Sequence, residues 1–369
     1  MRVLAALLLL LASPAIASAS VDLSHDFDRA TGTFAAPSFL ANTLDQWDGT
    51  PAFPPIVKQS PLGACQSFAL TAFMEYAFYR RTGQVVDFSE KATSYALLRY
   101  MIDEFHDAAT DSYPDGIFRG RPDLGSGVAM HMIDSLLKNG LWPNSVYSFG
   151  SLDATEGSIN LDVPLYMQVF EKAEAALKRE EYLTKIDEVF FSPPPARFVF
   201  KVPYLDFATG KPAVWEGHTP AELLGLTKAV RESFTVYHNR DLDPFFQPEW
   251  KEHKDVLLNA LAEETKKKGI KEEAVSAADL KQKIISSLEK RMVVMVAGSV
   301  WSGSWTEKDR VYNGGGGHAM VIVGYQQLGD KTIFKLRNSW GTEIGQGGYN
   351  LVEDRVLLPN LLEVTVLGI

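Results

Sequence analysis

One side chain in this sequence is a candidate nucleophile by its type and position: a single thiol. Cys65 is the only cysteine among 369 residues, and it follows the segment Gln59-Ser-Pro-Leu-Gly-Ala64. A helical pattern begins at Cys65, and the unpaired N–H groups of a helix N-terminus stabilise negative charge. The thiolate is the nucleophilic form, and a neighbouring imidazolium favours it further. Taken alone, such a thiol is more often a small buried side chain than a nucleophile.

Two blocks far along the chain supply partners for that thiol. His318 follows four glycines and opens one strand pattern, and Asn338-Ser-Trp-Gly follows another. An imidazole can accept the thiol proton, and a side-chain amide can fix the tautomer of that imidazole. Attack on a carbonyl creates an oxyanion, for which the backbone N–H of Cys65 and the amide of Gln59 are candidate donors. Gly63 would allow close approach of a substrate backbone.

The order and spacing of these blocks resemble the papain-like cysteine peptidases (peptidase C1 family). The matching segments are Gln59-x5-Cys65, His318-Ala-Met-Val-Ile-Val-Gly-Tyr325 and Asn338-Ser-Trp-Gly-Thr-x2-Gly-x2-Gly-Tyr349, within residues 53–149 and 277–352. The resemblance implies an α+β fold with a helical left lobe, a β-rich right lobe and an active site in the cleft between them. It implies hydrolysis of protein or peptide substrates without a cofactor or a metal.

Carried onto this sequence, the resemblance makes Cys65 the nucleophile, His318 the general base and then acid, Asn338 the orienting residue and Gln59 an oxyanion donor. The substrate-binding residues that it implies are Gly63, Gly125, Ser126, Gly127, Ala319 and Trp340. The Gly125–Gly127 turn would pair with an extended peptide, and Ala319 would form the floor of the pocket for the second residue before the cut. Trp340 would shield the hydrogen bond between His318 and Asn338 from water.

Several positions depart from the family pattern. Leu62 stands where a disulfide cysteine is usual, so that cross-link is absent. Gln66 replaces an aromatic residue after the nucleophile, Ile344 replaces a tryptophan on the leaving-group side, and Gly317 precedes His318 where an acid or amide is common. None of these changes removes a catalytic group, but the last three leave open the leaving-group specificity and the pH profile.

The segment between Cys65 and the motifs at His318 and Asn338 is longer than the family pattern requires. His318 and Asn338 lie 318 − 65 = 253 and 338 − 65 = 273 residues after Cys65, where about 130–150 is typical. We therefore expect a peptidase domain over 51–369 with an insertion over about 150–275 that packs near the cleft as helices and a hairpin. Residues 1–19 read as a cleaved signal peptide, which predicts a secreted or periplasmic protein with no membrane association after cleavage. Residues 20–50 are a short pro-segment or N-terminal arm that we expect to block the cleft.

Periodicity predicts the elements that position these residues. Helices are expected over 65–81, where the pattern indicates burial nearly all round, and over 89–104, 128–138 and 277–290. A single exposed helix is expected over 164–188, and another helix over 250–268. Strands are expected over 198–204, 233–237, 292–300, 318–325 and 332–337.

Composition limits the function classes. A net charge of −10 argues against a nucleic-acid partner, and the six other histidines have no metal-ligand spacing. Besides an exported endopeptidase, two readings stay open. One is an acyltransferase or peptide ligase with the same triad, in which an amine replaces water. The other is a catalytically silent binding protein on the same fold, against which the intact set of catalytic residue types weighs.

Overall fold

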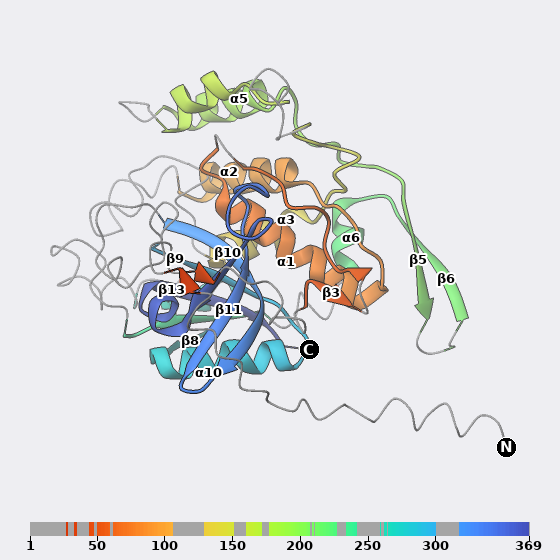
Figure 1. The fold of residues 1–369 in the computed structure, drawn as a ribbon. Helices are drawn as coiled ribbons and strands as arrows, with labels where there is room; N and C mark the ends of the chain where they lie inside the picture. Colours follow the sequence, from red (N-terminus) through yellow and green to blue (C-terminus); the bar gives the residue numbers. More distant parts are fainter. Residues whose placement is uncertain are drawn as a thin grey trace.

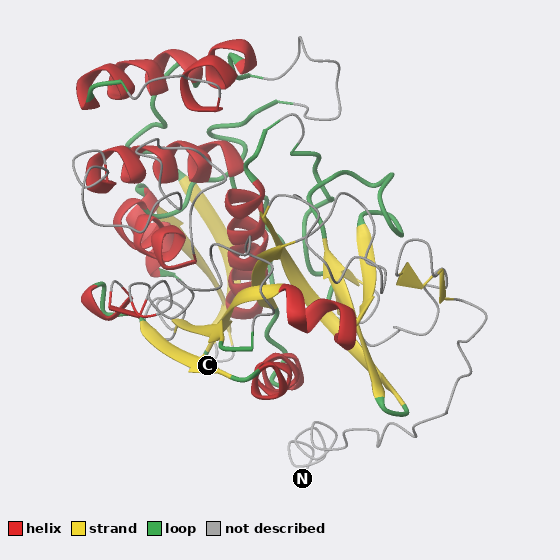
Figure 2. Ribbon diagram, turned by 90° about the vertical axis from the view of Figure 1, so that its left-hand side faces the viewer, coloured by secondary structure: helices red, strands yellow, loops and turns green. Residues whose placement is uncertain are grey.

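The computed structural model describes residues 27–28, 33–34, 44–47, 50–59, 62–105, 129–150, 160–171, 177–206, 209, 211–226, 234–241, 259, 262–263, 265–299 and 317–368. Helices pack on both faces of one large sheet (Figures 1 and 2). Among the described residues, no helix is long and apolar enough to span a bilayer.

The helical lobe consists of three helices that the sequence predicted closely. They are α1 (Cys65–Thr82), α2 (Glu90–Phe105) and α3 (Ala129–Asn139). Helix α1 is buried on nearly all sides, because it packs against strand β10 of the sheet and also against α2 and α3. It ends at Gly83, whose φ of 71° provides the left-handed C-cap that a side chain would strain. The helix that begins at Cys65 is therefore held as a rigid central element.

The sheet lobe is built on a sheet with the strand order β12-β11-β10-β9-β13-β7-β8 in the described part of the chain. Its strands are β7 (Phe234–Asn239), β8 (Lys271–Val275), β9 (Val294–Ser299), β10 (Gly317–Leu328), β11 (Lys331–Arg337), β12 (Tyr349–Glu353) and β13 (Leu361–Leu367). All neighbouring pairs are antiparallel except β7 with β8. The side chains of Ala319, Val321, Met295 and Leu367 join the core shared with α1 and α3.

The opposite face of the sheet is covered by α10 (Ala277–Glu289), α11 (Asp354–Leu357) and the short turn η6 (Leu358–Asn360). Their apolar side chains pack against Met320, Ile322, Phe334 and Val364. Each strand of β9 to β11 therefore alternates between two buried faces. This explains why these strands read as near-continuous apolar runs.

The region 150–275 departs from the single exposed helix predicted over 164–188. The structure has α4 (Val163–Tyr166) continuing into η4 (Met167–Glu171), and then a separate helix α5 (Arg179–Val189). The predicted exposure holds for one face of α5, where Glu180, Glu181 and Glu188 are exposed, but Tyr182, Ile186 and Val189 on its other face are buried in an apolar cluster with α2. The region continues through the hairpin of β5 (Phe200–Asp206) and β6 (Lys211–Gly217), then α6 (Pro220–Gly225). Most of the helix predicted over 250–268 lies outside the described residues.

Short elements near the N-terminus run along the sheet lobe. They are β1 (Phe27–Asp28), β2 (Thr33–Phe34), β3 (Gln46–Trp47) and β4 (Thr50–Pro51). Strand β2 lies against β12 at the edge of the sheet. The backbone N–H of Leu44 donates to the carbonyl of Val323, and Asp45 forms an ion pair with Lys335 at 2.8 Å. Whether residues 20–50 also cover the cleft stays a prediction.

Candidate active site

Cys65 is the first residue of α1, as the sequence predicted. Ala64 at the N-cap provides no capping side chain, and the first turn contains no acidic residue. The positive end of the helix is therefore not neutralised by its own side chains. Cys65 is buried, with 6% of its surface exposed. The position suits a thiol that must carry negative charge.

His318 and Asn338 meet across neighbouring strands. His318 lies at the start of β10 and Asn338 directly after β11, and Nε2 of the imidazole is 2.9 Å from Oδ1 of the amide. The same Oδ1 accepts the backbone N–H of Ser339 at 2.7 Å, and Nδ2 of Asn338 donates to Oδ1 of Asn350 at 3.0 Å. Because a backbone N–H can only donate, the atom facing it must be the amide oxygen.

That orientation fixes the tautomer of His318. An amide oxygen cannot donate, so Nε2 of His318 must carry the proton in this contact. The lone pair of the neutral ring is then on Nδ1, the nitrogen left to accept a further proton. The contacts of Asn338 to His318, Ser339 and Asn350 thus define which tautomer the neutral imidazole adopts.

The ring of Trp340 covers this pair. Its centroid lies 4.2 Å from that of His318, and the planes are inclined by 24°. Burial lowers the pKa of His318 to about 4, although the hydrogen bond to Asn338 acts in the opposite direction. The imidazole is therefore neutral at mildly acidic and neutral pH unless a negative charge, such as a thiolate, stands beside it.

Gln59 forms hydrogen bonds with Ser339, which directly follows Asn338. Its backbone N–H donates to the carbonyl of Ser339 at 2.8 Å, and its Oε1 accepts the hydroxyl of Ser339 at 2.5 Å. Its Nε2 donates to the carbonyl of Leu62 at 3.1 Å. Since the amide nitrogen has two protons, one remains for a further acceptor. Lys58, next to Gln59, forms an antiparallel bridge with Trp340.

The remaining predicted substrate-binding residues divide into two groups. Gly63 is exposed in the loop before α1, and Ala319 is buried on β10 facing the core shared with α1. Gly125, Ser126 and Gly127 lie outside the described residues. The sequence reasoning did not single out Ser339 or Asn350, although each is polar and nearly fully buried. Only Ser339 carried a signal, because it stands inside the motif.

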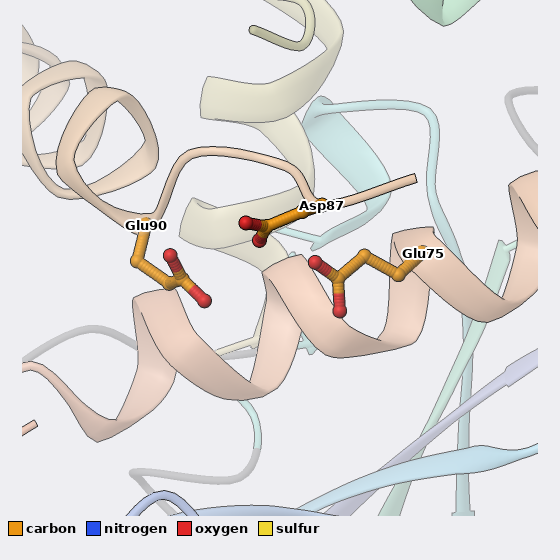
Figure 3. A group of neighbouring side chains, drawn as sticks. All are labelled: Glu75, Asp87 and Glu90. Atoms are coloured by element: carbon orange, nitrogen blue, oxygen red, sulfur yellow. The ribbon is translucent and has the colours of Figure 1, made fainter. Parts of the chain in front are cut away.

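A cluster of acids lies in the helical lobe, on α1, at the start of α2 and in the segment between them (Figure 3). Carboxylate oxygens of Glu75, Asp87 and Glu90 lie within 4.8 Å of one another, which is close enough to hold a cation. Burial raises the pKa of Glu75 well above its ordinary value and that of Glu90 to about 8, while the charge of Arg337 acts in the opposite direction on both. A carboxyl group that keeps its proton is a poor metal ligand, and the cluster already has Arg337 as its cation.

Arg337, at the end of β11, lies near this cluster and contacts residues 53–55, which precede Gln59. Its guanidinium donates to the carbonyls of Pro54 and Pro55 and lies 4.9 Å from the centre of the Phe53 ring. Because Arg337 directly precedes Asn338, these contacts hold the strand end from which Asn338 projects. The positive charge of Arg337 favours the ionised forms of Glu75 and Glu90, so the cluster couples α1 electrostatically to β11.

Helix α5 shares a buried apolar cluster with the segment before Cys65. Leu62, Ala64 and Phe68 belong to the same buried cluster as Ile186 and Phe190. The ring of Phe190 also packs edge-on against Tyr95 of α2, with 5.5 Å between centroids. Part of the 150–275 region thus belongs to the same apolar cluster as the segment that presents Cys65, while its role at the cleft stays a prediction.

Comparisons with known proteins agree with this architecture. A family model described as papain family cysteine protease matches residues 231–357, which include His318 and Asn338. PepW from Lactobacillus rhamnosis HN001 is similar in structure, with 16% identity and a TM-score of 0.54 over 85% of this chain and 80% of that chain. A search of curated protein sequences found no significant match.

Two other solved structures align with lower scores. One comes from work on the mite allergens Blo t 1 and Der p 1, with 14% identity and a TM-score of 0.39 over 86% of this chain and 67% of that chain. The other is procathepsin L 3 of the Tenebrio molitor larval midgut, with 13% identity and a TM-score of 0.35 over 93% and 76%.

The architecture defines an α+β protein in which a helical lobe whose central helix begins at Cys65 packs against a sheet lobe that carries His318 and Asn338. This is the papain-like fold, and the resemblance to the papain-like cysteine peptidases that the sequence suggested is confirmed.

Proposed function

We propose that this protein is a cysteine endopeptidase that hydrolyses protein or peptide substrates with Cys65, His318, Asn338 and Gln59. The observation that carries the proposal is the fixed tautomer of His318, in which Nε2–H is held by Asn338 and the lone pair is on Nδ1. A histidine with only a structural role needs no such arrangement. An imidazole that takes up a proton from a thiol does need it.

In the proposed acylation, Nδ1 of His318 takes the proton of Cys65 and the sulfur attacks the substrate carbonyl. The bond from sulfur to carbon forms, and the negative charge moves to the carbonyl oxygen. The backbone N–H of Cys65 and the second amide proton of Gln59 stabilise that oxyanion. When the C–N bond breaks, the imidazolium of His318 gives its proton to the leaving amine, and a thioester remains on Cys65.

Deacylation repeats the cycle with water. Nδ1 of His318 accepts a proton from water, and the resulting hydroxide adds to the thioester carbonyl. The C–S bond then breaks, the acid product leaves, and the thiol regains its proton from the imidazolium. Trp340 supports both steps, because its ring excludes water that would compete for the hydrogen bond between His318 and Asn338.

The test compares the wild type with Cys65→Ala on an unfolded protein and on dipeptidyl fluorogenic substrates between pH 4 and 8. We expect turnover by the wild type and none by the variant, with equal thermal stability. Iodoacetamide at pH 5–6 should alkylate Cys65 rapidly in the wild type and slowly in His318→Ala, since the thiolate depends on the imidazole. Cleavage that persists in Cys65→Ala would refute the proposal.

We also propose that residues 1–19 direct export and are removed, and that residues 20–50 restrict access to the cleft. The contacts of β2 with β12 and of Leu44 with Val323 support a segment that stays attached to the sheet lobe. Mass spectrometry of the exported protein should give an N-terminus near residue 20. A chain that begins near residue 48 should then show a higher kcat/KM than the longer form, and equal values would contradict the restriction.

A further inference from the structure

Asn350 on β12 is a buried amide whose neighbours on the same face of the sheet are apolar. It is 5% exposed and is the antiparallel partner of Leu336 on β11. Val352, two residues further along β12, lies on the same face and belongs with Leu336 to the apolar cluster under α10 and α11. An amide buried among such side chains costs free energy unless it is hydrogen-bonded. Asn350 at this position therefore calls for a polar partner.

That partner is the side-chain amide of Asn338. Its Nδ2 donates to Oδ1 of Asn350 at 3.0 Å, and this contact is buried. The backbone N–H of Asn338 also donates to the carbonyl of Gly348 at 3.0 Å, which continues the pairing of β11 with β12 by one step. Asn350 thus lies diagonally across from Asn338, within reach on the same face. The register of two strands, rather than a loop, sets the contact.

The contact with Asn350 differs in kind from the contact with Ser339. The backbone N–H that Oδ1 of Asn338 accepts belongs to Ser339, the next residue, so it does not tie the amide to another part of the fold. Asn350 lies on a different strand and holds the opposite end of the amide. With Oδ1 facing Nε2 of His318 and Nδ2 held by Asn350, the amide plane cannot turn about its Cβ–Cγ bond without breaking a buried hydrogen bond.

The orientation of this amide decides what His318 can do. While Oδ1 of Asn338 faces the ring, Nε2 carries the proton and Nδ1 keeps the lone pair. If the amide turned over, its NH2 group would face Nε2, and the neutral ring would carry its proton on Nδ1. In the proposed acylation Nδ1 must accept the proton of Cys65, so the reversed amide would leave the ring unable to act as the base. The imidazolium that forms next also needs an acceptor at Nε2, which the oxygen of the amide provides and its NH2 group does not.

We propose that Asn350 is a positioning residue for the proposed peptidase reaction, because it holds the Asn338 amide with its oxygen on Nε2 of His318. Asn350 acts through Asn338 and contributes no atom to the chemistry. The inference rests on the proposed function and adds a residue to the same site. The amide that orients the base is itself oriented by a second amide, and such supporting contacts keep a catalytic group in its productive geometry.

A purely structural role makes a different prediction. The backbones of β11 and β12 already pair from Ile333 to Arg337, so the strands do not depend on a side-chain contact to stay together. If Asn350 only satisfied a buried hydrogen bond, a leucine of similar shape would change the stability of the protein and leave the tautomer of His318 as it is. If Asn350 positions the amide, the same leucine changes both the tautomer population and the rate.

The test compares Asn350→Leu, which removes the acceptor at nearly constant volume, with Asn350→Asp, which keeps an oxygen in its place. On dipeptidyl fluorogenic substrates we expect Asn350→Leu to lower kcat by about tenfold with KM changed by less than about twofold, since one buried hydrogen bond is lost and no substrate contact changes. Asn350→Asp should keep kcat within about threefold of the wild type, because the acceptor is retained. The control is Asn360→Leu, which removes another buried amide, whose Nδ2 donates to the carbonyl of Val356, and it should keep the wild-type kcat.

Two further measurements separate positioning from packing. In an Asn338→Ala background, Asn350→Leu should cause no further loss of kcat, because the amide through which it acts is gone. In a Cys65→Ala background near pH 7, where burial keeps the ring neutral, ¹⁵N NMR of labelled histidine should show His318 protonated on Nε2. Asn350→Leu should add the form protonated on Nδ1, and Asn360→Leu should leave the spectrum unchanged. The signals of His318 are assigned by their absence from His318→Ala.

Each outcome separates the inference from the proposed function. Wild-type kcat and an unchanged histidine spectrum in Asn350→Leu would overturn the inference and leave the peptidase proposal standing. A loss of kcat that adds to the loss in Asn338→Ala, or that Asn350→Asp shares in full, would also overturn it. If circular dichroism shows that Asn350→Leu does not fold, Asn350→Ala removes the same oxygen and is judged by the same criteria. No turnover by the wild type would refute the peptidase proposal itself, and the spectrum of Asn350→Leu would then still decide the positioning role.

Discussion

Replacing the buried Glu363 by glutamine should change the stability of the protein relative to the wild type, and this difference should favour the variant more in alkaline solution than in acid solution. A carboxyl group whose folded-state pKa is raised contributes stability that is fully present below the unfolded pKa and is lost as pH rises through the folded pKa. For Glu363 the ordinary value is 4.5 and the folded value is about 7. The window of loss therefore runs from about pH 4.5 to about pH 7.

The magnitude follows from the width of that window. One pKa unit corresponds to about 1.4 kcal/mol, so the buried carboxyl group costs about 3 kcal/mol of folding free energy at pH 8 that it does not cost at pH 4.5. Glutamine keeps an acceptor for the backbone N–H of Ala129, which donates to Oε1 of Glu363 in the wild type, and it has no proton to lose. The free-energy difference between Glu363→Gln and the wild type should therefore shift by about 3 kcal/mol in favour of the variant between these two pH values.

Urea denaturation of both proteins at pH 4.5, 6 and 8 measures this shift. Glu216→Gln, which removes a surface carboxylate beside Lys201, controls for the change in net charge and should not reproduce the gain at pH 8. A difference between Glu363→Gln and the wild type that is the same at all three pH values would refute the reasoning. It would mean that the carboxyl group is solvated in the folded protein.

Three further substitutions test other parts of the structure. Asn338→Ala should lower kcat by roughly a hundredfold without changing the fold, because the tautomer of His318 is no longer fixed. Discontinuous activity assays measure kcat, and circular dichroism on the same samples measures the fold. Ser339→Ala should lower kcat/KM by roughly tenfold, because the Gln59 amide loses the hydroxyl that holds its oxygen, and a fully retained rate would count against Gln59 as an oxyanion donor. Ile186→Ala should destabilise the protein by about 2–5 kcal/mol in urea denaturation, because the side chain is fully buried in the apolar cluster with α2. A loss below about 0.5 kcal/mol would show that α5 does not pack against this cluster in solution.

The sequence predicted the local parts of this structure well. The helix at Cys65 begins where its apolar pattern begins, and the strands that carry His318 and Asn338 follow from continuous apolar runs. The pairing of His318 with Asn338 was expected from the family resemblance, not from spacing, because 20 residues of chain do not by themselves define a contact.

The contacts that the sequence could not predict are those between distant segments. Ser339 holds Gln59 across 280 positions, and Glu363 reaches Ala129 across 234. Such contacts depend on sheet register and on the packing of lobes, and no local pattern encodes either of them. For helix α5 the local composition was misleading. Its dense charge predicted an exposed helix, but three apolar side chains bury one of its faces against α2.

The two edge strands of the seven-stranded sheet, β12 and β8, differ in what covers them, and this difference affects whether two molecules can associate through the sheet. At one end β2 lies against β12. At the other, β8 has the sequence Lys-Glu-Glu-Ala-Val and pairs only with β7 in the described part of the chain. Charged side chains on an edge strand oppose the addition of another strand, and Lys271, Glu272 and Glu273 of β8 are charged. The edge is thus a barrier against the strand-to-strand aggregation that open sheets risk, and one that salt would weaken.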